Sequence, residues 1–151
     1  MSTTEQGELC LTCHAELADK QAEETAHAPF AESDCNACHV PHSAEQDKLL
    51  KGKPGEICLN CHAEVATEAA AYKFQHEPMA ENQCVACHSG HGSPHPGYQV
   101  KNQPALCLGC HGEVAEYWRD GALHPPAAED CTTCHNPHGS DIDFLGLVAS
   151  S

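Results

Sequence analysis

Residues 9–17 of the chain read LCLTCHAEL, and the same pattern returns as ICLNCHAEV at 57–65 and as LCLGCHGEV at 106–114. A second pattern alternates with it and reads CNACHVPH at 35–42, CVACHSGH at 84–91 and CTTCHNPH at 131–138. All 12 cysteines therefore lie in six CxxCH motifs. A random chain of this composition would hold roughly 0.1 such motifs, so the spacing reflects a chemical requirement.

The CxxCH spacing is typical of covalent haem attachment. Two thiols add to the two vinyl groups of one porphyrin, and the adjacent histidine ligates the iron. We therefore expect six haem c groups as cofactors. The attaching cysteines are Cys10 and Cys13, Cys35 and Cys38, Cys58 and Cys61, Cys84 and Cys87, Cys107 and Cys110, and Cys131 and Cys134. The proximal iron ligands are His14, His39, His62, His88, His111 and His135.

Two other uses of paired cysteines are open alternatives. Zinc ribbons also combine CxxC pairs, and the 19 to 22 residues between successive pairs are close to ribbon spacing. A disulfide framework needs an even number of cysteines, which the chain has. Neither alternative explains a histidine after every pair, so haem attachment is favoured.

Seven of the 13 histidines follow no CxxC pair. His27, His76 and His124 each begin an HxP sequence seven or eight residues before a CxxCH, and His42, His91 and His138 each lie three residues after a proximal histidine. Their repetition predicts that these six are the distal iron ligands. His95 lies outside the pattern, and we expect a solvated loop residue, with haem ligation or a subunit contact as the alternative.

Local geometry suggests which distal histidine serves which haem. A helix from His14 toward His27 would span on the order of 18 Å, too far for both to hold one iron. We therefore predict that His27, His76 and His124 complete the second, fourth and sixth haems. His42 starts on the proximal side of its own haem, so His42, His91 and His138 are predicted to reach the first, third and fifth haems.

The repeats predict a single domain, 1–151, with internal units at 9–56, 57–105 and 106–145. Leu, Ile, Val and Phe make up about 15% of the chain, whose net charge is −15, a composition typical of disordered polymers. The haems must then supply the core, and we expect no stable fold without them. Stretches rich in Ala and Glu after His14, His62 and His111 predict helices of about three turns. The predicted class is mainly short α-helices and loops with little or no β structure.

Charge and hydropathy limit the partners and the compartment. With 7 Lys and Arg against 22 Asp and Glu, nucleic acid is not expected as a ligand, whereas redox proteins with basic patches are. No stretch reaches the ~20 apolar residues of a membrane span. Covalent haem attachment follows export, so a periplasmic or extracellular location is expected. Met1 to Leu9 has neither a basic region nor an apolar run, and we expect a mature or excised chain whose export signal has been removed.

The CxxCHxPH pattern at 35–42 and 131–138, with Gly90 in place of proline in the middle copy, resembles the doubled-CXXCH multihaem c-type cytochromes. AspLysLeuLeu at 47–50, before the next motif, extends the resemblance. Proteins with this pattern are similar to the pentahaem donors of nitrite reductases, to decahaem conduits and to extracellular cytochrome filaments. The resemblance implies bis-histidine haems packed nearly in contact, and electron transfer.

We therefore expect an electron relay or wire segment and not an enzyme, with self-assembly into filaments as a special case. The alternative is a multihaem reductase of small nitrogen or sulfur oxyanions, which would need an iron with an open position. No CxxCK motif is present to suggest one. Only Met1 and Met79 could replace histidine as ligand, so low potentials are expected on all six haems.

The cofactor count is testable by intact mass. The mature protein should carry the mass of six covalent haems, because all six motifs are complete, and its spectra should show only low-spin iron. Four or five haems in fully matured protein would contradict this assignment.

Overall fold

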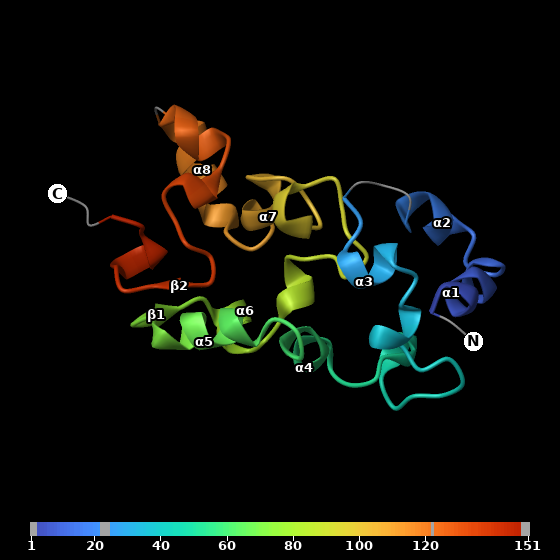
Figure 1. The fold of residues 1–151 in the computed structure, drawn as a ribbon. Coiled ribbons are helices and arrows are strands. Elements are labelled where there is room, and N and C mark those ends of the chain that lie inside the picture. Colours follow the sequence, from blue (N-terminus) through green and yellow to red (C-terminus); the bar gives the residue numbers. More distant parts are fainter. Residues whose placement is uncertain (1–2, 22–24, 122, 149–151) are drawn as a thin grey trace.

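The computed structural model describes residues 3–21, 25–121 and 123–148 and consists of short helices joined by loops (Figure 1). The α-helices are α1 (Thr3–Leu11), α2 (Glu16–Gln21), α3 (Ala28–Ala31), α4 (Pro54–Leu59), α5 (Ala63–Ala71), α6 (Glu77–Ala80), α7 (Ala105–Leu108) and α8 (Gly112–Asp120). The 3₁₀ turns are η1 (Cys35–Ala37), η2 (Asp47–Leu49), η3 (Cys84–Ala86), η4 (Pro96–Tyr98), η5 (Pro125–Ala128), η6 (Cys131–Thr133) and η7 (Asp143–Leu145). Strands β1 (Phe74–Gln75) and β2 (Gly139–Ser140) form one small antiparallel sheet. The predicted fold class is confirmed.

The helices predicted after His14, His62 and His111 are α2, α5 and α8. They are shorter than the three turns expected, because α5 and α8 have nine residues each and α2 has six. Tyr72 ends α5 by taking an extended conformation, and Gly121 ends α8 in the same way.

Each CxxCH motif forms one tight helical turn. The backbone N–H of the histidine donates to the carbonyl of the first cysteine at 2.9–3.0 Å in all six motifs. Residues three apart in such a turn lie on one face, so the two cysteines point the same way. The local fold thus presents two thiols and an imidazole together.

Each HxP histidine begins a short helix. His27 and His76 are the residues before α3 and α6, and His124 precedes η5, all with extended backbones. Proline fits the first turn of a helix because the N–H it lacks would have no partner there. The HxP sequence therefore holds each imidazole at a helix start, at the edge of a unit.

Backbone pairing joins consecutive units. Phe74 pairs with Ser140 and Gln75 with Gly139, and at the preceding junction Ala26 pairs with Gly92. In both cases the segment before an HxP histidine of one unit pairs with the segment after the second CxxCH of the next. The units consequently follow one another, and the ends of the chain lie at opposite sides of the molecule (Figure 1).

Glycine is required where the backbones meet. Gly92 has φ +95°, and a Cβ built there would lie 2.3 Å from the carbonyl oxygen of Thr25. At the second junction a Cβ on Gly139 would lie 2.9 Å from Cδ2 of Tyr72. A side chain at either position would separate the two units.

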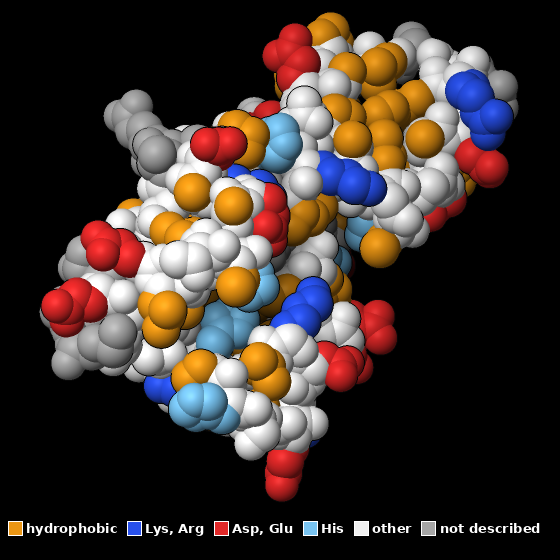
Figure 2. Space-filling view, turned by 90° about the vertical axis from the view of Figure 1, so that its right-hand side faces the viewer, with side chains coloured by type: hydrophobic (Ala, Val, Ile, Leu, Met, Phe, Trp, Pro, Cys, Tyr) orange, Lys and Arg blue, Asp and Glu red, His pale blue; other side chains and the backbone are white. Residues whose placement is uncertain are grey.

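Protein side chains make only a small core. The buried apolar residues are Ala26, Phe30 and Ala69 among those described. The chain exposes 10460 Å², whereas a folded monomer of 16.1 kDa exposes roughly 7,400 Å². Figure 2 shows histidine side chains among hydrophobic ones on a hollowed face. Within the described residues no helix is long and apolar enough to cross a membrane.

Gly92 at the junction and Gly90 two residues earlier can be substituted as a matched pair. Gly92→Ala should lower the free energy of unfolding by about 1–3 kcal/mol, because it adds a Cβ at positive φ against the Thr25 carbonyl. Gly90→Ala should change it little, since a Cβ there meets no atom within 4 Å. Thermal unfolding of the haem-loaded proteins measures both. Equal effects would contradict the close approach at Gly92.

Candidate haem sites

Four pairs of histidine rings face one another, and each pair combines a proximal histidine with a predicted distal one. The units joined by the pairs are the first (9–56), second (57–105) and third (106–145). The ring centroids are 6.1 Å apart for His27 and His62, 6.1 Å for His39 and His91, 6.0 Å for His76 and His111, and 6.2 Å for His88 and His138.

This separation fits a metal ion between the rings. A metal–imidazole bond of roughly 2 Å on each side, plus about 1 Å from each ligating nitrogen to its ring centre, gives about 6 Å. Rings in direct contact would be closer, as the 4.7 Å between Phe30 and His91 shows. Each pair thus has the spacing of two axial ligands on one haem iron, beside a CxxCH motif that would attach the porphyrin.

A glutamate lies near the first proximal histidine of each unit, two residues later in the sequence. Nδ1 of His14 lies 3.6 Å from Glu16, and the corresponding distances are 3.8 Å for His62 and Glu64 and 3.6 Å for His111 and Glu113. These carboxylates are close to Nδ1 and leave Nε2 for a metal.

The second proximal histidine uses a backbone carbonyl nine residues later. Nδ1 lies 2.9 Å from the Lys48 carbonyl oxygen for His39, 2.7 Å from Gly97 for His88 and 2.8 Å from Phe144 for His135. All three carbonyls belong to 3₁₀ turns whose backbones have φ near +60°. The loop after each second CxxCH therefore turns back to hold its own histidine.

The distal histidines are held across the unit junctions. Nδ1 of His27 lies 3.0 Å from the Gly90 carbonyl oxygen, and that of His76 lies 3.0 Å from the Pro137 carbonyl oxygen. Burial lowers the pKa of His91, with a further contribution from His39, and burial followed by His88 does the same for His138. A lowered pKa keeps the imidazole neutral, which is the form that ligates metals.

The structure does not bring together the pairs predicted within each unit for His27, His76, His91 and His138, and the pairing of His42 and His124 stays a prediction. His27 faces His62 of the next unit and not His39, and His91 faces His39 of the preceding unit and not His62. His76 and His138 repeat the arrangement at the second junction. The physical reason is the backbone pairing between units, which carries the HxP segment of one unit away from its own second CxxCH.

Four histidines that the sequence predicts as ligands have no facing imidazole among the described residues. They are the proximal His14 and His135 and the predicted distal His42 and His124. His95 lies in the turn before η4, where its backbone N–H donates to Ser93 Oγ. No ring pair in the described residues includes His95.

The cysteines of consecutive motifs are neighbours. Burial raises the pKa of each of five thiols, and a cysteine of the adjacent motif raises it further; the pKa of Cys107 reaches about 11. The neighbours are Cys35 with Cys10, Cys38 with Cys61, Cys58 with Cys84, Cys87 with Cys110, and Cys107 with Cys131. The six motifs thus follow one another in space in the order of the sequence.

Within the described residues the cysteines form no disulfide, and no three His, Cys, Asp or Glu side chains gather as a metal-ion site. Two sets of groups near Nδ1 of the proximal histidines were not predicted from the sequence. One is the glutamate two residues after the histidine of each first motif. The other is the 3₁₀ turn after each second motif, which in the first unit includes the AspLysLeuLeu segment, so both sets repeat visibly in the sequence.

A substitution at His27 tests the cross-unit pairing. In a background that lacks the second haem (Cys35→Ala, Cys38→Ala), His27→Ala should make one of the five remaining haems high-spin, because His27 faces His62. In the matched background without the third haem (Cys58→Ala, Cys61→Ala), it should change none. Electron paramagnetic resonance with haem counting by mass measures the result. The reverse outcome would restore the pairing within units.

The doubled CXXCH motif family matches the chain at residues 27–67, 76–116 and 124–149, more than half of its length. Each match begins at an HxP histidine, and the first two each include one facing pair, His27 with His62 and His76 with His111. No curated protein matches this chain. The repeated motifs, their order in space and the family match agree, and the chain belongs to the doubled-CXXCH family of multihaem c-type cytochromes.

Proposed function

We propose that this chain relays electrons outside the cytoplasm through six covalent haems, each held between two histidines. The carrying observation is the unbroken order of the motifs, in which each CxxCH has a cysteine beside the next motif along the chain. Haem c supplies reversible one-electron chemistry when bound. A continuous row of such groups is what a relay requires.

The residues around each site would set the potentials. Histidine on both sides of an iron gives a lower potential than a methionine ligand. The Glu carboxylates near His14, His62 and His111 and the carbonyl oxygens near His39, His88 and His135 place negative charge beside the proximal imidazoles. Together with the net charge of −15 they favour ferric iron.

Location and partners follow from the cofactor and the charge. Covalent haem attachment outside the cytoplasm supports a periplasmic or extracellular protein. The acidic surface suits redox proteins that present basic patches, and the association rate should fall as salt screens the attraction.

A reductase of small nitrogen or sulfur oxyanions is the second candidate. One observation favours it, since neither His14 nor His135 faces another imidazole in the described part of the chain. An iron with one protein ligand could bind a substrate.

Voltammetry and turnover separate the two functions. A film of the haem-loaded protein should show six reversible one-electron steps at potentials below that of a histidine/methionine cytochrome measured alongside. Nitrite or sulfite should not speed reoxidation of the dithionite-reduced protein beyond its rate in buffer. A catalytic current with either anion would favour the reductase.

A further inference from the structure

Two of the haem sites, the second and the fourth, are alike in their ligands and differ in the charges around them. The second haem would lie between His39 and His91 and the fourth between His88 and His138, with ring centres 6.1 and 6.2 Å apart. Nδ1 of His39 and Nδ1 of His88 each lie close to a backbone carbonyl oxygen, at 2.9 and 2.7 Å. Both motifs have a further CxxCH before and after them in the chain. The two sites can therefore be compared charge by charge.

Two lysines lie beside the second CxxCH through their backbones. The carbonyl oxygen that contacts Nδ1 of His39 belongs to Lys48, and the backbone N–H of Lys51 donates to the Cys38 carbonyl oxygen at 2.9 Å. Burial and Cys61 raise the pKa of Cys38, and the positive charge of Lys51 lowers it. Positive charge thus acts on a thiol that would attach the second haem.

A third lysine, Lys20, acts on the distal histidine of the same site. It belongs to α2, whose last residue, Gln21, donates from its side chain to the Phe30 carbonyl oxygen at 2.7 Å. The Phe30 ring packs against the His91 ring with 4.7 Å between their centres. Burial is the largest cause of the lowered pKa of His91, and the charges of Lys20 and Lys48 contribute to it. Helix α2 and the turn at Lys48 therefore direct positive charge toward His91.

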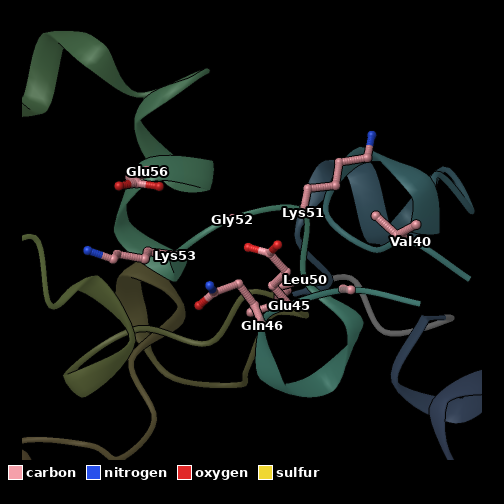
Figure 3. A pocket seen from close by; sticks show the side chains of 9 residues that line it. Val40, Glu45, Gln46, Leu50, Lys51, Gly52, Lys53 and Glu56 are labelled. Carbon is pink, nitrogen blue, oxygen red and sulfur yellow. The ribbon is translucent and has the colours of Figure 1, made fainter.

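Carboxylates near the second site do not cancel this charge. Glu45 and Glu56 line a hollow of about 360 Å³ together with Lys51, and Figure 3 shows the Lys51 side chain extending away from both of them. Asp34 acts on Cys38 in the sense opposite to Lys51, because it raises the pKa of the thiol. Three lysines against this carboxylate leave the second site positive.

The fourth haem site has a glutamate instead. The Tyr72 hydroxyl donates to Oε1 of Glu68 at 2.8 Å and accepts from Nδ2 of Asn136 at 3.5 Å. Oδ1 of Asn136 in turn accepts from the backbone N–H of His138 at 3.1 Å. Burial lowers the pKa of His138, followed by His88, whereas Glu68 acts in the opposite direction. This chain of hydrogen bonds links a negative charge to the distal histidine of the fourth site.

The differing side chains occupy equivalent positions of the repeat. The first position lies six residues after the first proximal histidine, the second supplies the carbonyl at Nδ1 of the second proximal histidine, and the third donates to the carbonyl of the last cysteine. The corresponding residues are Lys20 and Glu68, Lys48 and Gly97, and Lys51 and Val100. The two sites thus differ in side-chain charge on one shared backbone arrangement.

The other sites do not repeat this set of lysines. In the third unit the same three positions hold Tyr117, Phe144 and Leu147. At the first motif of every unit a glutamate lies 3.6–3.8 Å from Nδ1 of the proximal histidine. Three of the seven Lys and Arg of this acidic chain therefore lie at one haem site.

We propose that the haem of His39 and His91 has the highest potential of the row and takes the first electron that a reduced partner protein donates, its iron passing from ferric to ferrous. Positive charge near an iron favours the ferrous state, because reduction adds one negative charge to the site. Since the second and fourth haems share their ligand types, the difference between them comes from the surrounding charges. The inference rests on the proposed relay, and it adds the place where an electron rests within it.

Alanine methyl groups can report on the two haems separately. Ala37 and Ala86 lie between the cysteines of the second and fourth motifs, and no other motif has an alanine there. Low-spin ferric haem is paramagnetic and ferrous haem is not, so the resonance of a nearby methyl group changes on reduction. In haem-loaded protein with ¹³C-labelled alanine methyl groups, each of the two signals follows its own haem. Ala37→Ser and Ala86→Ser assign the signals.

A potentiometric titration followed by these signals tests the order of reduction. At each applied potential the ratio of ferrous to ferric haem should be roughly tenfold higher at Ala37 than at Ala86, which corresponds to about 59 mV for a one-electron step. Raising the salt concentration should reduce the difference, because the charges involved are exposed.

Charge reversal at the equivalent positions tests the cause. Lys20→Glu should lower the ratio at the second haem by roughly threefold, and Glu68→Lys should raise it at the fourth haem by a similar factor. Arg119→Glu is the matched control, because it changes the net charge by the same amount at an exposed residue of α8 in the third unit. It should move neither signal.

Haem counting by mass and electron paramagnetic resonance verify that each variant keeps its haems and their spin state. Where a reversal disturbs ligation, Lys20→Gln and Glu68→Gln replace it, and each should give a smaller shift in the same direction. Glu68→Gln retains an oxygen that accepts from Tyr72.

Other results would overturn the proposal. Equal ratios at Ala37 and Ala86, or reduction of the fourth haem before the second, would mean that the lysines do not set the order. A shift with Lys20→Glu no larger than that with Arg119→Glu would mean the same. The proposed relay would survive these results, since it fails only if the voltammetric steps are absent or an oxyanion turns over.

Discussion

The structure depends on imidazole rings that face one another across unit boundaries. Each of the four pairs brings a proximal histidine of one unit within 6.0–6.2 Å, centre to centre, of a histidine from its neighbour. A bond from each ring to a shared iron would tie the units together more strongly than the few apolar contacts between them. Haem binding would then also hold the units together.

This constraint explains features that would be unusual in an ordinary domain. The apolar core is limited to a few residues, and the surface is large for the mass. Glycine at Gly92 and Gly139 allows backbones to meet at the junctions, where an HxP segment pairs with the segment after a CxxCH. Backbone carbonyl oxygens 2.7–2.9 Å from Nδ1 of His39, His88 and His135 orient these three proximal rings.

The same arrangement links structure to function. Histidine rings of consecutive units face one another, and cysteines of neighbouring motifs lie close together from the first motif to the sixth.

The sequence by itself determined the family, the six attachment motifs and the class of fold, because CxxCH spacing is local chemistry and the repeats are visible in register. It also predicted His27, His42, His76, His91, His124 and His138 as the distal set, which stays a prediction, although four of the six face a proximal imidazole. Only the tertiary structure decided which ring faces which. Spacing in the sequence relates residues within one unit. The ring that each of these histidines faces depends instead on backbone pairing between residues more than 60 positions apart, such as Ala26 with Gly92.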